Sequence, residues 1–426
     1  MVIHVVTPGD TLYSIALNYG VSAESIIINN GLEANQPLVV GQALLILLPR
    51  TDYTVQAGDT LQSIAAAFGT NVSALLRNNL SLNGRQDIQT GEKLVIDYYT
   101  QPLGSIYLNG YAYPFIQDEA LYRTLPFLSY ISVFTYGIGE DGSLIPADDS
   151  KILSESQNYG ARPIMVISTL SASGSFSNEL AALILNNPGL RSTLIENIVS
   201  EMKEKGYYGL NVDFEYVLPS DRDAFISFNE ALANALHQEG LQLFISLAPK
   251  TSAQQKGLLY ESHDYRALGE TADRALIMSY EWGYKYGPPM AVAPINKVRQ
   301  VLEYALTEIP AEKIFLGMPN YAYDWELPYI RNVTAAENIS NLRAVQIAAE
   351  NKAEIEFDNL SKTPYFYYRD SSMNPHVVWF EDPRSYKAKA ALVHEYGISG
   401  INIWNTLRFF PQGLLTISSM YDLNKF

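Results

Sequence analysis

The sequence predicts an α/β protein: a closed barrel of eight parallel strands surrounded by helices, preceded by two small repeated units. Two observations predict this fold class. From residue 105 to the C-terminus, eight apolar runs alternate with helical stretches, and before them a shorter pattern occurs twice. Alternating strand and helix signals are typical of a parallel sheet. Eight such units fit a (β/α)8, or TIM, barrel.

The composition is that of a folded, acidic protein. Of 426 residues, 47% are hydrophobic and 17% are charged, which excludes extensive disorder. The formal net charge of −16 would repel a nucleic-acid backbone, so we expect no nucleic-acid partner. The absence of cysteine excludes disulfides, thiolate metal sites and cysteine nucleophiles. The 30 tyrosines suit sugar rings and a large core equally well.

The N-terminus has no basic region followed by an apolar stretch, so we predict no signal peptide. No uncharged apolar run reaches the ~18 residues of a transmembrane helix, so we expect no membrane insertion. No obligate protein partner is evident from the sequence.

The internal repeat predicts two βααβ units. Residues 6–16 match residues 55–65, and the asparagine pair 29–30 matches the pair 78–79. Each copy begins with a short strand and ends with another, at 43–48 in the first copy and at 93–96 in the second. In each turn, either the aspartate or the threonine after it can cap the next helix.

Each copy resembles a LysM module, a small fold that binds glycans containing N-acetylglucosamine. The resemblance rests on the Gly-Asp-Thr-Leu turn, the asparagine pair and the closing strand. It implies two modules, at 1–49 and 50–98, and a groove between the turn and the loop after the second helix. A duplicated domain without a ligand is the alternative. The implied glycan contacts are Gly9, Asp10, Thr11, Leu12 and Asn30 in the first copy and Gly58, Asp59, Thr60, Leu61 and Asn79 in the second.

The barrel is expected to span residues 99–426. Its eight predicted strands are 105–111, 130–135, 163–168, 209–216, 243–248, 275–280, 314–319 and 400–404. The gap from 320 to 400 is too long for one helix and contains three further strand-like runs, at 353–357, 364–368 and 377–381. We therefore predict a small β-rich insertion after the seventh strand, over roughly 321–385.

The fourth predicted strand carries the strongest chemical signal. Alternate residues of a strand point to opposite faces, so Asn211, Asp213 and Glu215 share one face. A parallel barrel strand is normally apolar on both faces, and unpaired buried carboxylates are costly. The row therefore indicates an active site at the C-terminal mouth of the barrel. An ordinary solvent-facing edge strand is the alternative.

The two carboxylates of this row suit general acid catalysis. At a spacing of two residues they lie ~6–7 Å apart. Their mutual repulsion keeps one of them protonated to higher pH. Glu215, nearer the mouth, would be the general acid, and Asp213 its charged partner.

This strand resembles the Asp-x-x-Asp-x-Asp-x-Glu signature of glycoside hydrolase family 18, the chitinase-like enzymes. Asp213 and Glu215 match its last two acidic positions, whereas Asn211 and Tyr208 replace the first two. The loss of a carboxylate at Asn211 puts in doubt how Asp213 exchanges its proton and whether the pH optimum is typical.

Other segments support the same family. Met278-Ser-Tyr-Glu281 resembles its Met-x-Tyr-Asp motif, Ile403-Trp404 resembles the tryptophan under the sugar site, and 379–389 resembles the segment before the last strand. The third-strand Ser-x-Gly-Gly motif is matched poorly, at 168–174.

The resemblance implies a retaining, substrate-assisted hydrolysis, in which the sugar's own 2-acetamido oxygen attacks C1 and water opens the resulting oxazolinium. Glu215 would protonate the leaving oxygen and then activate the water. Asp213 would orient the acetamido N–H, supported by Asn211. The Tyr280 hydroxyl would donate to the acetamido oxygen, and Trp404 would pack under the N-acetyl methyl group.

Tyr111, Asn320 and Tyr321 lie at the C-terminal ends of predicted strands, where they either line sugar subsites or simply pack. We expect no cofactor and no metal, because none of the five histidines has a metal-site spacing. No Gly-x-Ser-x-Gly elbow is present, which argues against a serine hydrolase. The expected substrate contacts are Trp404, Glu281, Met278, Tyr111, Asn320 and Tyr321.

Two LysM modules before a family 18 barrel resemble the cortical-fragment-lytic N-acetylglucosaminidases of spore-forming bacteria. The resemblance implies hydrolysis of N-acetylglucosamine bonds in peptidoglycan or another N-acetylglucosamine polymer. It also implies a location in the spore coat or cortex or in the cell wall. A chitinase and a non-hydrolytic chitinase-like lectin are the alternatives, although such lectins typically lack the acid that stands here as Glu215.

Overall fold

The computed structural model describes residues 1–33, 35–170 and 176–426, so part of the poorly matched motif at 168–174 lies outside the described residues. Eight parallel strands close into a barrel because β5 pairs with both β18 and β6. The (β/α)8 prediction is therefore confirmed. In chain order the barrel strands are β5 (Ser105–Ala112), β6 (Tyr130–Ile138), β8 (Arg162–Ser168), β9 (Gly209–Asp213), β10 (Gln242–Leu247), β11 (Arg274–Ile277), β12 (Ile314–Pro319) and β18 (Gly400–Trp404).

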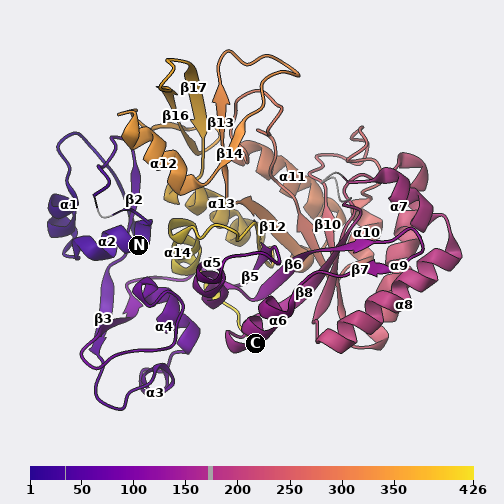
Figure 1. Cartoon of the computed structure of the whole chain (residues 1–426), viewed down its shortest axis with the longest axis horizontal. Coiled ribbons are helices and arrows are strands. Elements are labelled where there is room, and N and C mark those ends of the chain that lie inside the picture. The colour runs from indigo at the N-terminus through magenta and orange to yellow at the C-terminus, as the bar shows by residue number, and fades with distance from the viewer. Residues whose placement is uncertain (34, 171–175) are drawn as a thin grey trace.

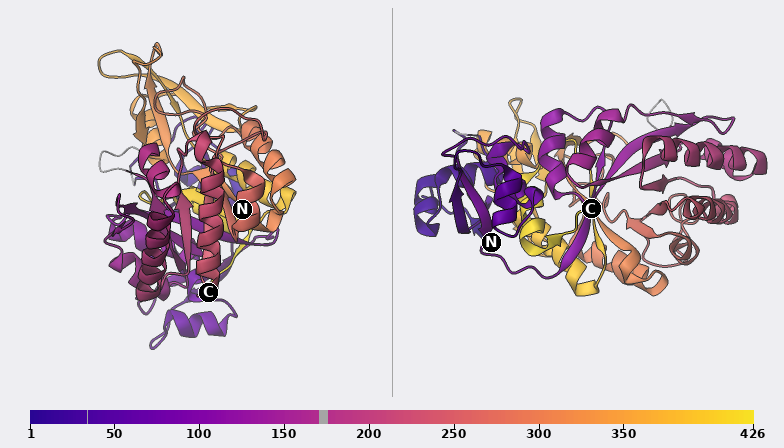
Figure 2. Two further views of the ribbon diagram at one scale, coloured as in Figure 1. Left: turned by 90° about the vertical axis from the view of Figure 1, so that its right-hand side faces the viewer. Right: turned by 90° about the horizontal axis from the view of Figure 1, so that it is seen from below.

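Helices cover the outside of this barrel (Figures 1 and 2). The sequence explains where α8, the longest of the described helices, begins and ends. Asn187 accepts hydrogen bonds from two N–H groups of the first turn, Pro188 occupies the first helical position, and Gly206 ends the helix at a φ of 74°. The outer helices are α5 (Asp118–Thr124), α6 (Ser150–Asn158), α7 (Asn178–Leu185), α8 (Pro188–Lys205), α9 (Arg222–Gln238), α10 (Tyr265–Thr271), α11 (Ile295–Glu308), α13 (Pro383–Tyr396) and α14 (Pro411–Met420).

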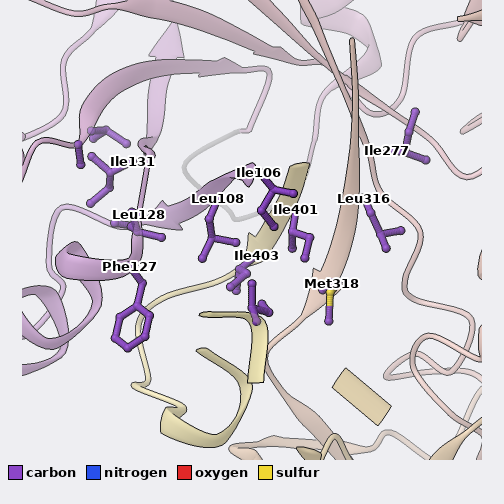
Figure 3. Close-up of a cluster of buried hydrophobic side chains, with 14 of the residues drawn as sticks. Ile106, Leu108, Phe127, Leu128, Ile131, Ile277, Leu316, Met318, Ile401 and Ile403 are labelled. Atoms are coloured by element: carbon purple, nitrogen blue, oxygen red, sulfur yellow. The ribbon is translucent and has the colours of Figure 1, made fainter. Parts of the chain in front are cut away.

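The core lies on both sides of the barrel wall. Aliphatic side chains of β5, β6, β11, β12 and β18 belong to one buried cluster with side chains of the helices. Figure 3 shows part of this cluster, including Ile106, Leu316 and Ile401. Full burial of one such side chain stabilises the fold by ~1.5–3 kcal/mol. Aromatic residues, among them Tyr130 and Phe315, fill the interior. The barrel is therefore a packed scaffold whose free space lies at its mouth.

The predicted β-rich insertion is present between β12 and β18 as a five-stranded antiparallel sheet (Figure 1). The structure adds two strands and a helix to the three predicted runs. The helix was missed although its buried Ala344, Val345, Ile347 and Ala348 follow a helical period. The elements are β13 (Ala322–Glu326), β14 (Glu337–Ile339), α12 (Asn341–Glu350), β15 (Glu356–Asp358), β16 (Thr363–Arg369) and β17 (Pro375–Trp379).

The two N-terminal units have the predicted βααβ order. In each, the threonine caps the first helix: the hydroxyls of Thr11 and Thr60 accept from the third N–H of the helix at 3.0 Å. The aspartate Asp10 instead accepts from the Thr7 N–H, at 2.7 Å. The elements are β1 (Val2–Val5), α1 (Leu12–Tyr19), α2 (Ala23–Asn30) and β2 (Ala43–Ile46), then β3 (Pro49–Thr54), α3 (Leu61–Ala67), α4 (Val72–Asn78), η1 (Leu80–Leu82) and β4 (Lys93–Tyr98).

The first unit is fixed to the barrel and to the insertion. On α14, the Gln412 amide donates to Asn30 Oδ1 at 2.7 Å and to the Ala43 carbonyl at 3.0 Å. Gly41 lies so close to the Ile355 carbonyl that a Cβ would stand 1.8 Å from its oxygen. Only glycine fits there, so the loop after α2 is seated against the insertion.

The second unit also contacts the barrel. Arg77 donates to the Pro126 carbonyl at 2.9 Å, and the Tyr159 hydroxyl donates to the Gly84 carbonyl at 2.7 Å. Both units lie along one side of the barrel (Figure 1). In the described part of the chain, no helix is both long and apolar enough to cross a membrane.

Candidate active site

The carboxylate row lies at the end of the fourth barrel strand. β9 ends at Asp213, so Glu215 follows the strand and is not within it, contrary to the predicted 209–216. The side chains nevertheless continue to point alternately outward and inward as far as Glu215. Phe214 points outward and stacks on Phe225 and Phe228 of α9, which directs Asp213 and Glu215 to the other side.

Both carboxylates line a cavity of about 730 Å³, within the ~300–1,000 Å³ of ligand sites. All six expected substrate contacts line the same cavity, together with Tyr280. The sequence therefore identified residues from five barrel strands that the fold brings together. The sequence did not predict the other lining residues, although several are tyrosines, which suit sugar rings. These residues are Tyr216, Leu259, Tyr260, Tyr284, Tyr323, Asn338, Asn405, Leu407 and Arg408.

Asn211 lies beneath the cavity and does not line it. Its fully buried amide donates to the Tyr111 hydroxyl at 2.7 Å and to Ser246 Oγ at 3.1 Å. The two hydroxyls also lie within 3.1 Å of each other. Where the family pattern has a carboxylate, this protein has a neutral hydrogen-bonded cluster. The cluster adds no negative charge next to Asp213.

Asp213 is buried, and burial raises its pKa above the ordinary aspartate value, partly opposed by the Ser246 hydroxyl. Its Oδ1 atom has no hydrogen-bond partner among the described residues. A buried carboxylate oxygen without a partner is costly, so this atom is ready to accept from a substrate N–H.

Glu215 is a carboxyl group whose surroundings favour its protonated form. Burial is the main cause of its raised pKa, and the charges of Asp213 and Glu281 add to it. A carboxyl that keeps its proton near neutral pH can donate it to a leaving oxygen. The two acids thus have different environments, as separate roles in acid catalysis require.

A buried histidine fixes the backbone of Glu215. Because His263 Nδ1 accepts from the Ala248 N–H at 3.2 Å, its proton lies on Nε2, which donates to the Glu215 carbonyl at 3.3 Å. Burial lowers the His263 pKa to about 4, so the ring is neutral near pH 7. No sequence spacing links residues 215 and 263, so this contact was missed.

Aromatic side chains build the floor of the cavity. Trp404 packs edge-on against Tyr111 and Phe134, at centroid distances of 5.2 and 4.9 Å, which fixes its ring. Burial and nearby charges raise the pKa of Tyr280 well above the ordinary tyrosine value, so its hydroxyl remains a donor.

Glu281 also lines the cavity, where its carboxylate accepts from the hydroxyls of Tyr321 and Tyr323. It adopts a φ of 64°, an unusual conformation for a residue with a side chain. Apart from residues 34 and 171–175, which are not described, no cluster of three or more His, Asp or Glu side chains could hold a metal ion.

The expected contacts of the small units divide into two groups. The turn residues are exposed or partly exposed: Gly9, Asp10, Thr11 and Leu12 in the first unit and Gly58, Asp59 and Thr60 in the second. Leu61 is instead a core residue, with no exposed surface.

The two asparagines are also internal. The Asn30 side chain bridges Ile26 and the backbone of Leu45, and Asn79 joins α4 to Val95 in the same way. Neither reaches the surface as a glycan ligand would.

Comparison with known proteins decides the family. The model of "Glycosyl hydrolases family 18" matches residues 129–407, and that of "LysM domain" matches residues 4–46 and 53–97. The chain belongs to glycosyl hydrolases family 18. It carries two LysM modules in addition.

The chain resembles other proteins over most or all of its length. The chain is 37% identical over 425 residues to a cortical fragment-lytic enzyme of Bacillus anthracis, covering 99% of this chain and 98% of the relative. A cortical fragment-lytic enzyme of Bacillus subtilis (strain 168) is 41% identical over 310 residues, covering 72% of this chain and 71% of the relative. The crystal structure of the Bacillus cereus spore cortex-lytic enzyme SleL superposes with a TM-score of 0.84 at 34% identity, covering 99% of both chains.

Proposed function

We propose that this family 18 hydrolase is an N-acetylglucosaminidase that cleaves N-acetylglucosamine bonds in peptidoglycan, above all in spore cortex fragments. The observation that carries the proposal is the pair of acids in the cavity, with Glu215 held protonated and Asp213 presenting a free oxygen. The relatives named as cortical fragment-lytic enzymes support the substrate.

Each group in the cavity has one step to perform. The Asp213 carboxylate accepts from the acetamido N–H, which turns the acetamido oxygen toward C1. Tyr280 donates to that oxygen, and Trp404 packs against the acetyl methyl group. As the acetamido oxygen bonds to C1, the glycosidic bond breaks and Glu215 gives its proton to the departing oxygen.

The second half of the reaction reuses Glu215, now a carboxylate. It takes a proton from a water molecule, whose oxygen attacks C1 and opens the oxazolinium ring. C1 is attacked once from each face, so the product keeps the configuration of the substrate. Asn211 positions this chemistry from below through Tyr111 and Ser246, without touching the substrate.

The LysM modules would hold the enzyme on its polymer through their turns. Beside the first turn, the Tyr13 side chain is 76% exposed, which offers an aromatic face to a sugar ring. A protein held in this way would act at the spore cortex or the cell wall. Because Asn30, Leu61 and Asn79 are internal, the proposed glycan contacts are the turn residues.

A chitinase is the second candidate, since the acetamido-directed chemistry requires only N-acetylglucosamine. A lectin with an inactive barrel is the third. Glu215 and Asp213 both line the cavity, which favours an enzyme over a lectin.

The test is mass spectrometry of soluble cortex peptidoglycan fragments after incubation with the protein. The Glu215→Gln variant keeps the size of the side chain and removes its acidity, and Glu196→Gln on the exposed face of α8 is the matched control. New fragments ending in reducing N-acetylglucosamine should form with the wild type and the control, and at a ~10²–10⁴-fold lower rate with Glu215→Gln. New ends from chitin oligomers alone would favour the chitinase. No new ends from either polymer would favour the lectin.

A further inference from the structure

The active-site cavity carries one cation among several acids. Asp213, Glu215 and Glu281 line it, and the whole chain has a formal net charge of −16. Arg408, in the loop between β18 and α14, is the only cation among the described residues that line the cavity. The acids, when ionised, repel a substrate that carries carboxylates, whereas Arg408 attracts it.

Hydrogen bonds hold the loop that carries Arg408. The Asn320 amide donates to the carbonyls of Asn405 and Arg408, at 2.8 Å each, so both of its hydrogens are used. The Thr406 hydroxyl and N–H donate to the Tyr111 carbonyl, at 2.8 and 2.9 Å. The loop is thus tied to the ends of two barrel strands, β12 and β5. These bonds fix the backbone of Arg408 at the wall of the cavity.

The Arg408 side chain is exposed, and its guanidinium makes no hydrogen bond or ion pair within the described part of the chain. Arg299, in contrast, is paired with Glu395. The raised pKa values of Asp213 and Glu215 arise from burial and, for Glu215, from nearby negative charges, with no contribution from Arg408. Neither an internal ion pair nor tuning of the two acids therefore accounts for this arginine.

A guanidinium with uncommitted donors suits a carboxylate, which it can bind through two parallel hydrogen bonds. Trp404, the expected contact of the N-acetyl methyl group, precedes Arg408 by four residues, a span of at most ~14 Å. Arg408 therefore lies within reach of a sugar next to the one that Trp404 contacts. In peptidoglycan that neighbouring sugar carries a lactyl group and often a peptide, both of which supply carboxylates. In chitin it is uncharged.

We propose that Arg408 is a specificity-determining residue that binds a carboxylate on the sugar next to the N-acetylglucosamine being cleaved. It selects acidic glycans of the peptidoglycan type over uncharged polymers of N-acetylglucosamine. Arg408 contacts a substituent and not the reacting bond, so it acts on substrate binding and not on the proton transfer by Glu215. This proposal rests on the proposed function and names the part of the substrate that the cavity distinguishes.

The test compares the full chain with its Arg408→Gln variant on soluble peptidoglycan fragments and on the same fragments with their carboxylates converted to methylamides. Arg191→Gln, at a partly exposed position on α8 outside the cavity, is the matched control for the lost charge. Arg408→Gln should raise the KM for the acidic fragments by about tenfold, because hydrogen bonds to a charged group are lost. With the methylamides this rise should be absent, and Arg191→Gln should match the wild type on both substrates.

Fragments with and without the peptide distinguish the two sources of the carboxylate. Without the peptide only the lactyl carboxylate remains, so a rise in KM there assigns the contact to the lactyl group. A rise only with the peptide present assigns it to a peptide carboxylate.

An equal rise in KM with acidic and methylamide fragments would overturn the proposal, since Arg408 would then only shape the cavity. An unchanged KM with both, or a fall in kcat alone, would also overturn it. Binding of the same fragments in a Glu215→Gln background, with and without Arg408→Gln, gives a readout without turnover. If the wild type cleaves no peptidoglycan, the proposed function fails, while the binding constants still decide whether Arg408 recognises the carboxylate.

Discussion

The substitution Asn211→Asp tests the electrostatic account of the active site. It restores the family carboxylate beneath Asp213. The hydroxyls of Tyr111 and Ser246, which now accept from the Asn211 amide, can rotate and donate to the new carboxylate, which favours its ionised form.

The magnitude follows from the strand geometry. Positions 211 and 213 are two residues apart, about 6.6 Å at the rise of a strand. At an effective dielectric constant of ~20, two charges at that distance interact by ~2.5 kcal/mol. That energy raises the pKa of Asp213 by about 1.8. Glu215 is about twice as far away, so its pKa rises by about half as much.

The assay is the pH dependence of kcat/KM on soluble fragments. The active form has Asp213 ionised and Glu215 protonated, so the rate falls below the first pKa and above the second. Because a nearby negative charge raises both, the acidic limb should move up by ~1–2 pH units and the alkaline limb by about half of that. The profile should therefore narrow and move to higher pH.

Asn211→Leu is the control, since it removes the hydrogen bonds without adding charge. It should lower the rate and leave both limbs near their wild-type positions. An acidic limb that stays in place, or moves to lower pH, in Asn211→Asp would refute the role of charge beneath Asp213.

Three further substitutions test the site and the joints between the units. Tyr280→Phe removes a donor to the acetamido oxygen and should lower kcat by ~10–100-fold, equivalent to ~1.5–3 kcal/mol; an unchanged kcat would exclude this donor. Asn30→Ala leaves the Leu45 N–H without a partner and removes one of the two acceptors of the Gln412 amide, so the free energy of unfolding should fall by ~2–5 kcal/mol. The fall should exceed that of Asn79→Ala, which lacks the contact with α14, when both are measured by denaturant unfolding. Leu61→Ala should cost the second module ~2–5 kcal/mol, more than the partly exposed Leu12→Ala costs the first, while soluble short fragments are still hydrolysed. Loss of that hydrolysis would contradict a cavity that forms without the LysM modules.

The active site could be predicted largely because its residues follow barrel strands. The row Asn211, Asp213 and Glu215 is recognisable as polar residues in an otherwise apolar strand, and the closed barrel places every strand end at one mouth. His263 and Arg408 could not be found in this way. They reach the site through loops, whose paths depend on tertiary contacts and not on a repeating pattern.

The LysM modules show the opposite case. Their fold follows from local signals, since the turn, the helix cap and the helical period all lie within a few residues. The resemblance to LysM modules implies that the side chains of Asn30 and Asn79 contact a glycan. In the structure they satisfy buried backbone groups, which polarity alone cannot distinguish from ligand binding.

The sequence by itself determined the barrel, the insertion, the repeated modules and the two acids, because periodicity and residue type record local geometry and burial. Only the tertiary structure decided how the modules sit. Gln412 meets Asn30 across 382 positions of the chain, and Gly41 admits the Ile355 carbonyl. Such contacts between distant segments leave no period in the sequence, yet they fix the first module against the barrel and the insertion.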